Sequence, residues 1–158
     1  MEQAEEVQAK VDARLARAEL FVNGRRPVVW IILHESVLHQ QILPAAGMAE
    51  QLNHVAKLAQ RRQLVPQVMP WNVGAHPLML GAAKVMTFTD APPLAYTESP
   101  YSGATIDDPP IVKKYSYAYD VVRAAALSPQ ASVAMIQQAA EDHRNGNQPG
   151  YFERPPLA

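Results

Sequence analysis

Apolar positions recur at three- and four-residue steps in the first part of the chain, which predicts a helix from about Glu2 to Leu20 with one narrow apolar stripe. The members of the stripe are Ala4, Val7, Val11, Leu15, Ala18 and Val22. Asn23-Gly24 then ends the helix. A helix of this kind either docks on its own domain or pairs with a second copy. Docking within the chain is the favoured interpretation, and a homodimer is the alternative.

The pattern changes after Pro27, where Val28 to Leu33 form a continuous apolar run rich in β-branched side chains. A run of this kind is typical of a strand that is buried on both faces, so we expect it to be the central strand of a sheet. The run stops at His34-Glu35-Ser36. A polar, titratable cluster at the end of a core strand is typical of binding sites in open sheets.

The second half of the pattern predicts a crossover and then a meander. A helix with apolar residues at Met48, Leu52, Val55 and Ala59 ends near Arg61-Arg62, and Leu64 to Met69 forms the next strand. The strand-helix-strand order favours a right-handed crossover that leaves the two strands parallel. The antiparallel meander is expected to comprise Lys84 to Thr89, Leu94 to Glu98 and Ala104 to Ile106.

Two helices complete the expected fold. The first begins at Asp107-Asp108-Pro109-Pro110, runs to Leu127, and has an apolar face made of Ile111, Tyr115, Ala118, Val122 and Ala125. Ser128-Pro129 caps the second, which runs to about His143 with Val133, Ile136 and Ala140 facing the core. The predicted fold class is α+β, a small mixed sheet packed by N-terminal and C-terminal helices. We expect one domain over residues 1–145 and a flexible tail over residues 146–158.

Composition narrows the function classes. With 158 residues, of which 48% are hydrophobic and 18% charged, the chain suits one domain with a buried core. The absence of cysteine excludes disulfides, thiolate nucleophiles and cysteine-bound metal sites. A formal net charge of −1 gives no electrostatic basis for direct nucleic-acid binding. The acidic start lacks the features of a signal peptide and no long apolar run is present, so we expect a cytoplasmic protein without membrane contact.

The candidate site lies where the two parallel strands end. Because carboxyl ends of parallel strands meet at one edge, the loop Pro70 to Pro77 and His34-Glu35-Ser36 are expected to line one cleft. Alternation places Leu94, Tyr96 and Glu98 on one strand face, so Glu98 lies either at a wet strand end or aimed at that cleft. Candidate catalytic residues are Glu35, Glu98 and His34. Candidate ligand-binding residues are Trp71, His76, Tyr96, His39 and Tyr101.

Each candidate also has a plainer interpretation. His34 and His39 are five positions apart, one more than the four that place two helical ligands on one face, so no metal is expected. No phosphate-binding glycine loop or nucleotide fingerprint is present, so no other cofactor is expected. Glu35 either caps the following turn through backbone N–H groups or acts as a ligand-anchoring or general-base carboxylate. Trp30 is interpreted as a core residue, whereas Trp71 lies in a loop with proline and glycine and is the preferred ligand contact.

A series of short motifs in fixed order resembles a known family. The motifs are Pro27-Val28-Val29-Trp30-Ile31-Ile32-Leu33-His34-Glu35-Ser36-Val37-Leu38-His39, Met48-Ala49-Glu50-Gln51-Leu52, Pro66-Gln67-Val68-Met69-Pro70-Trp71, Gly74-Ala75-His76-Pro77, Ala95-Tyr96-Thr97-Glu98 and Arg123-Ala124-Ala125-Ala126-Leu127-Ser128-Pro129. Over about Glu5 to Glu141 the chain resembles the C-terminal domain of unknown function of actinobacterial antitoxin-like transcriptional regulators with a helix-turn-helix.

The resemblance implies a domain that senses a ligand or binds a small partner protein, next to a helix-turn-helix that binds DNA. No helix-turn-helix precedes Met1, so we expect no DNA binding by this chain. His34 replaces a usually acidic residue of the family, and Gln40-Gln41-Ile42-Leu43-Pro44 replaces its glycine-containing turn. Three hypotheses follow: a domain that binds a small molecule or small partner protein, a metal-free biosynthetic enzyme of the cyclase or isomerase type, and a structural dimer built through the first helix.

Overall fold

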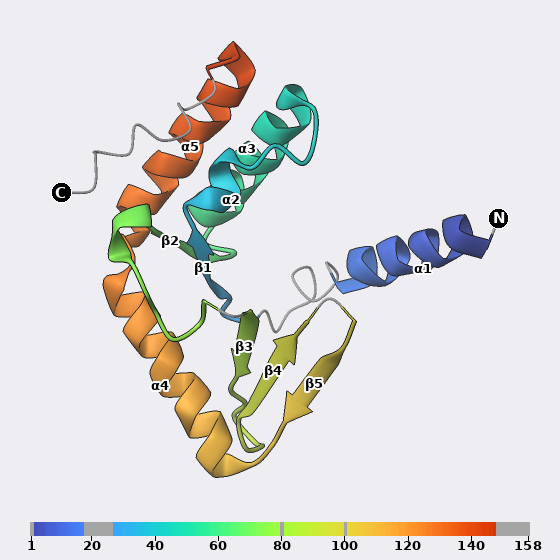
Figure 1. Cartoon of the computed structure of the whole chain (residues 1–158), viewed down its shortest axis with the longest axis vertical. Helices are drawn as coiled ribbons and strands as arrows, with labels where there is room; N and C mark the ends of the chain where they lie inside the picture. The colour runs from blue at the N-terminus through green and yellow to red at the C-terminus, as the bar shows by residue number, and fades with distance from the viewer. Residues whose placement is uncertain (1, 18–26, 80, 100, 148–158) are drawn as a thin grey trace.

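The computed structural model describes residues 2–17, 27–79, 81–99 and 101–147, and it confirms a mixed α+β fold (Figure 1). A parallel pair of strands and an antiparallel three-stranded meander form two separate sheets. The elements in chain order are α1 (Glu2–Ala16), β1 (Trp30–His34), α2 (Ser36–His39), α3 (Ala45–Gln60), β2 (Val65–Met69), η2 (Trp71–Val73), β3 (Ala82–Met86), β4 (Leu94–Glu98), β5 (Gly103–Ile106), α4 (Pro109–Ala125) and α5 (Pro129–Asn145).

Strands β1 and β2 pair in parallel, as predicted, in a register that runs from Trp30 beside Val65 to His34 beside Met69. The expectation that β1 is a central strand buried on both faces is wrong. β2 is buried along most of its length, whereas β1 lies at an edge with only half-buried and exposed side chains. The apolar run misled the prediction because the meander forms its own sheet and gives β1 no second neighbour among the described strands.

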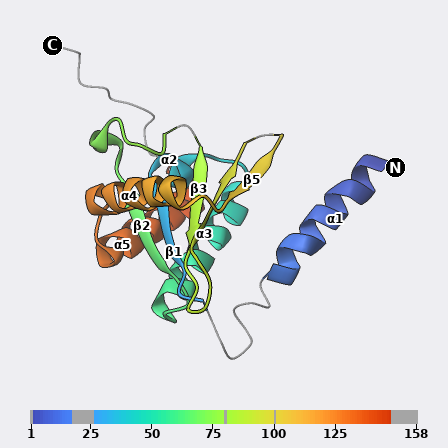
Figure 2. The same cartoon turned by 90° about the horizontal axis from the view of Figure 1, so that it is seen from below.

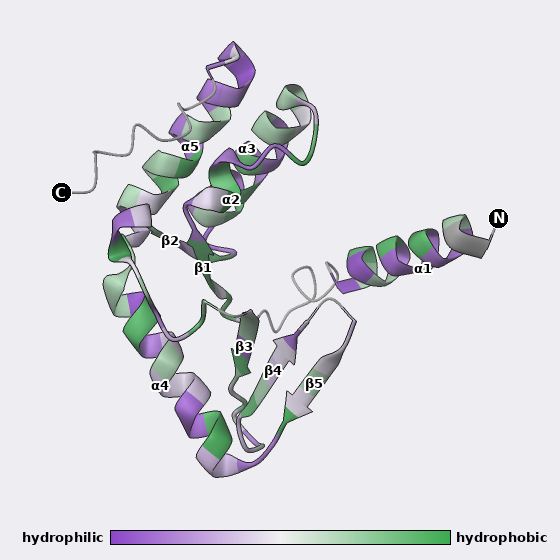
Figure 3. Cartoon of the chain, in the orientation of Figure 1, coloured by the Kyte–Doolittle hydropathy of each residue, from purple (hydrophilic) through white to green (hydrophobic). Residues whose placement is uncertain are grey.

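The hydrophobic core lies where β2 meets α3 and α5. Its fully buried members include Leu38 of α2, Val68 of β2 and Ile136 of α5. Successive side chains of a strand face opposite ways, so the neighbouring Gln67 points away from α3 and α5, and its amide nitrogen bonds the Leu127 carbonyl at 2.7 Å. Figure 3 shows hydrophobic residues along β1 and β2 at the centre of this arrangement.

The meander β3–β4–β5 is antiparallel, as predicted, and α4 packs against it. Ala95 of β4 is fully buried, while Tyr96 lies on the opposite face of the sheet beside Lys84. Figure 2 shows α4 crossing in front of the strands, so it links the meander to the parallel pair.

The helices at the C-terminal end begin where the sequence predicted. The Asp108 carboxylate accepts a hydrogen bond from the Ile111 amide, and the Ser128 hydroxyl accepts one from the Ala131 amide. Ile136 and Ala140 face the core as expected. The predicted apolar face of α4 is wrong at both ends, since Ile111 is exposed where Val112 is buried, and Ala125 is exposed. Residues 148–158 of the expected tail lie outside the described part of the chain.

Helix α1 does not dock on the domain, which overturns the favoured interpretation of its apolar stripe. Every described side chain from Ala4 to Arg17 is exposed, with Val7 at 60% and Leu15 at 65%. Figures 1 and 2 both show α1 standing apart from the other elements. The predicted continuation of this helix to Leu20 and its end at Asn23-Gly24 fall outside the described residues.

Candidate functional site

The ends of β1 and β2 bring four of the predicted residues together, and we call His34, Glu35, His39 and Trp71 the rim. The Glu35 amide donates to the Met69 carbonyl at 2.9 Å, which extends the parallel pairing one step past β1. The chain then turns into the short helix α2 on one side and into η2 on the other. The prediction that parallel pairing places Glu35 beside the loop after β2 is therefore confirmed at Trp71.

The Glu35 carboxylate joins the two segments of the rim. Its Oε2 accepts a hydrogen bond from the Trp71 amide at 2.9 Å, and its Oε1 lies 3.8 Å from Nε2 of His39. The side chain is only 17% exposed. The cap interpretation is therefore correct in kind, but the amide that Glu35 satisfies begins η2 and not its own helix α2, where Glu35 makes no side-chain cap.

His34 and Trp71 meet edge to face, with ring centroids 4.7 Å apart and planes at 90°. Nδ1 of His34 accepts from the Ser36 amide at 3.2 Å and lies 2.8 Å from the Ser36 hydroxyl. Because an amide can only donate, these contacts favour the tautomer with its proton on Nε2. Trp71 keeps 45% of its surface exposed, so the indole is both oriented and accessible.

His39 closes the rim from α2. It stands four positions after Glu35, so the imidazole and the carboxylate share one face of the helical turn. Its Nδ1 is buried and has no hydrogen-bond partner in the part of the chain that the structure describes. The separation of 3.8 Å from Glu35 is longer than a hydrogen bond, so the pair is an ion pair only when His39 is protonated.

The other predicted residues lie elsewhere. His76 bonds within its own loop, where its Nδ1 accepts from the Leu78 amide at 3.3 Å. Tyr96 lies under Lys84, whose Nζ is 5.1 Å from the ring centroid, and its hydroxyl occupies the space where a side chain at Gly103 would begin. Glu98 is exposed at the end of β4, the wet strand end of the two alternatives, and Tyr101 is fully exposed.

A family model described as a domain of unknown function, DUF5753, matches residues 1–138. The chain belongs to the DUF5753 family. No curated protein and no solved structure matches it significantly. The match includes every residue of the rim and reaches from α1 into α5, so the site described here lies wholly within the DUF5753 domain.

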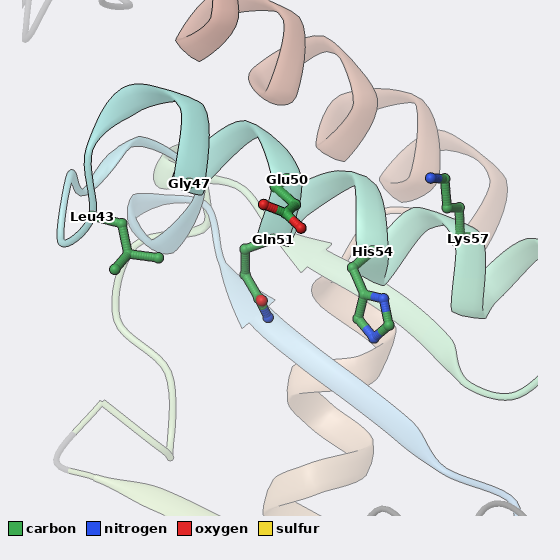
Figure 4. Close-up of a pocket in the computed structure, with 6 residues that line it drawn as sticks. All are labelled: Leu43, Gly47, Glu50, Gln51, His54 and Lys57. Atoms are coloured by element: carbon green, nitrogen blue, oxygen red, sulfur yellow. The ribbon is translucent and has the colours of Figure 1, made fainter. Parts of the chain in front are cut away.

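Sequence reasoning missed two features of this DUF5753 domain, the first of which is a pair of hollows along α3. One, of about 480 Å³, is lined by Leu43, Gly47, Glu50, Gln51, His54 and Lys57 (Figure 4). The other, of about 530 Å³, lies between α3 and Arg144 of α5. The α3 residues that line the first hollow recur at three- and four-residue steps in the sequence, and this spacing could have indicated that they share one face of the helix. Both hollows hold exposed polar residues, and neither includes a rim residue.

The second missed feature is a cluster at the start of β1. The Trp30 indole N–H donates to Oε1 of Gln67 at 2.7 Å, and the Arg123 guanidinium lies 5.2 Å from the indole centroid. The Tyr119 hydroxyl donates to the Trp30 carbonyl at 3.3 Å. Burial raises the pKa of Tyr119 above its ordinary value, and this outweighs the positive charge of Arg123, which lowers it.

Two further properties of the described residues concern metal binding and membrane crossing. Within residues 2–17, 27–79, 81–99 and 101–147, no group of three or more histidine, aspartate or glutamate side chains is placed to hold a metal ion. In the same ranges, no helix combines the length and the apolar character that crossing a membrane requires.

Proposed function

We propose that this DUF5753 domain is a binding domain akin to the effector domains of antitoxin-like helix-turn-helix regulators, and that its rim binds a small partner protein. The observation that carries the proposal is the hydrogen bond from the Trp71 amide to Glu35, which anchors the backbone of the partly exposed Trp71 at the carboxyl ends of two parallel strands. The ordered motifs that the chain shares with those regulators support the same class of function.

The chemistry of the rim suits a basic group on a protein surface. Tryptophan is enriched among residues that dominate binding energy, and its ring face attracts cations. Oε1 of Glu35 lies 3.8 Å from His39, beyond hydrogen-bond distance, and it is the oxygen that a lysine or arginine of the partner would contact.

A small-molecule function has one observation in its favour. His39 presents a buried, unpartnered Nδ1 within the described residues and faces the Glu35 carboxylate, an arrangement that a metal-free enzyme of the cyclase or isomerase type uses for proton transfer. Turnover of metabolites from a cell extract, followed by mass spectrometry and lost in His39→Gln, supports this second candidate. A profile that His39→Gln leaves unchanged counts against it.

The partner proposal is tested with a random peptide library displayed on phage and selected on the folded protein. Trp71→Ala and Glu35→Gln are expected to weaken the selected peptides about tenfold or more, because the first removes the anchor and the second the charge. Phe88→Ala and Glu98→Gln are the matched controls, since both residues are exposed outside the rim. Equal binding by all four variants contradicts the proposal.

A further inference from the structure

Strand β1 has the sequence of a central strand and the position of an edge strand. Natural edge strands are protected by lysine, proline, bulges or inward charges, because their unpaired backbone groups attract other strands. Trp30-Ile31-Ile32-Leu33-His34 contains none of these devices, and Ile31, Ile32 and Leu33 are only half-buried. The residue types of β1 therefore suit a neighbour that the described chain does not supply.

The direction of the backbone groups follows from the parallel register. The Val65 amide donates to the Val29 carbonyl, and the Glu35 amide donates to the Met69 carbonyl. Backbone groups alternate along a strand, so Ile31 and Leu33 also point toward β2, and Trp30, Ile32 and His34 point outward. The Tyr119 hydroxyl reaches the Trp30 carbonyl on that outer side, as the alternation requires.

On the opposite edge of the same sheet, the chain pairs both outward backbone groups of Val68. Pro66 has no N–H on the outer side of β2. The Val68 amide donates to the Ser132 hydroxyl at 2.9 Å, and the Val68 carbonyl accepts from the Leu127 amide at 2.9 Å. On β1, by contrast, the described residues offer no backbone partner to the outward groups of Ile32 and His34. The outward groups of Val68 on β2 are therefore paired within the chain, whereas those of Ile32 and His34 on β1 have no backbone partner among the described residues.

Tyr119 decides which kind of strand the open edge accepts. Two β1 strands related by a twofold axis at Ile32 would place Trp30 of one copy beside His34 of the other. The Tyr119 hydroxyl already occupies the Trp30 carbonyl, so this register lacks a free acceptor at both of its ends. An axis at Leu33 would place Trp30 of one copy beside Ser36 of the other, where the strand has already turned into α2. The free segment is confined to Ile32 through His34, which fits an extended segment of a different protein that begins beside Ile32.

We propose that a partner protein adds one extended strand to β1, pairing with the outward backbone groups of Ile32 and His34. This inference rests on the proposed partner-binding function and gives its binding mode. The alternate side chains of the added strand cover Ile32 and His34 on one face and Leu33 on the other, so they are apolar or β-branched. The added strand then runs from β1 toward the start of α2, next to the rim.

The test uses peptides selected from the random phage library on the intact protein. Ile32→Pro removes an outward N–H and none of the N–H groups that bond β2, while Ile32→Val is the control that keeps the N–H. Ile32→Pro is expected to weaken the peptides about tenfold, the change that one main-chain hydrogen bond represents. In the unmodified protein, bound peptide is expected to slow hydrogen exchange of the Ile32 and His34 amides. N-methylation of single peptide residues is expected to disrupt binding at alternate positions, where the peptide N–H bonds β1.

The outcomes separate this inference from the proposed function. Peptides that need Trp71 and Glu35 but leave exchange at Ile32 and His34 unchanged overturn strand addition and leave the rim proposal intact. Protection of both amides with normal binding by the rim variants supports strand addition and rejects the rim. A dimer that Ile32→Pro dissociates, measured by light scattering, shows that a second copy occupies the edge and overturns the inference. A library without any binder overturns both proposals.

Discussion

Glu35 and Trp71 lie 36 positions apart in the sequence, and the hydrogen bond between the Trp71 amide and the Glu35 carboxylate joins the segments that follow two parallel strands. The bond satisfies a donor that the first turn of a helix otherwise leaves unpaired. It also anchors the backbone of Trp71, while the edge-to-face contact with His34 helps to orient the indole. A single carboxylate thus serves both the fold and the candidate site.

Replacement of this carboxylate separates its two roles. Glu35→Ala is expected to lower the free energy of unfolding by about 1–2 kcal/mol, because the Trp71 amide loses its acceptor. Glu35→Gln keeps an oxygen acceptor at the same place and is expected to retain most of that stability. Urea unfolding followed by tryptophan fluorescence measures both variants, with Glu98→Ala as the exposed control. A Glu35→Ala variant as stable as the control shows that the bond contributes nothing.

The sequence predicted the strands and helices well where one local signal dominates. Asp108 and Ser128 cap their helices as expected, since a capping residue followed by proline determines a helix start whatever packs around it. The parallel pairing of β1 with β2 follows from the intervening helix α3, and it correctly placed Glu35 next to Trp71. These inferences need only spacing along the chain.

The errors concern which surfaces meet, and spacing along the chain does not determine this. The apolar run in β1 predicts a buried strand, yet its burial depends on whether the meander joins the same sheet. Tyr96 was placed near the rim, but α4 packs on the opposite face of β4 and leaves the tyrosine beside Lys84. The stripe of α1 predicts a contact without identifying the partner.

Gln67 is the buried polar residue on which the Trp30 cluster depends. It is 5% exposed and bonds the part-buried Trp30 indole and Leu127 carbonyl, so Gln67→Ala removes both hydrogen bonds and leaves a small cavity. We expect a loss of about 2–4 kcal/mol in the free energy of unfolding. Gln60→Ala, on the exposed end of α3, is the control. Equal unfolding midpoints for the two variants refute this role of Gln67.

Ser132 closes the outer edge of β2 from the first turn of α5. Ser132→Ala removes the acceptor of the buried Val68 amide and is expected to cost about 1–3 kcal/mol in the free energy of unfolding. Ser128→Ala removes only an exposed helix cap and is expected to cost about 1 kcal/mol. Amide exchange at Val68 distinguishes them, because only Ser132→Ala accelerates it. Unchanged exchange in Ser132→Ala contradicts the proposed closure of this edge.

Deletion of residues 1–17 tests the separation of α1 from the domain. Its described side chains are exposed, so the truncated protein is expected to unfold within about 0.5 kcal/mol of the full chain. Urea unfolding and light scattering, measured together, give stability and mass. A clear loss of stability at constant mass means that α1 docks on its own domain after all. A mass reduced by half means that α1 joins two copies.

Tyr119 is expected to make the free energy of unfolding depend on pH in the alkaline range. Because burial raises its pKa in the folded state, the unfolded chain loses this proton first, at about pH 10, and the folded state holds it to higher pH. The stabilisation is therefore fully present below about pH 10 and is lost as pH rises through the raised value. Urea unfolding between about pH 8 and 11 is expected to show a shallower decline for Tyr119→Phe than for the unmodified protein. Tyr117→Phe, more exposed on the same helix, is the control, and identical slopes for all three proteins contradict the assignment.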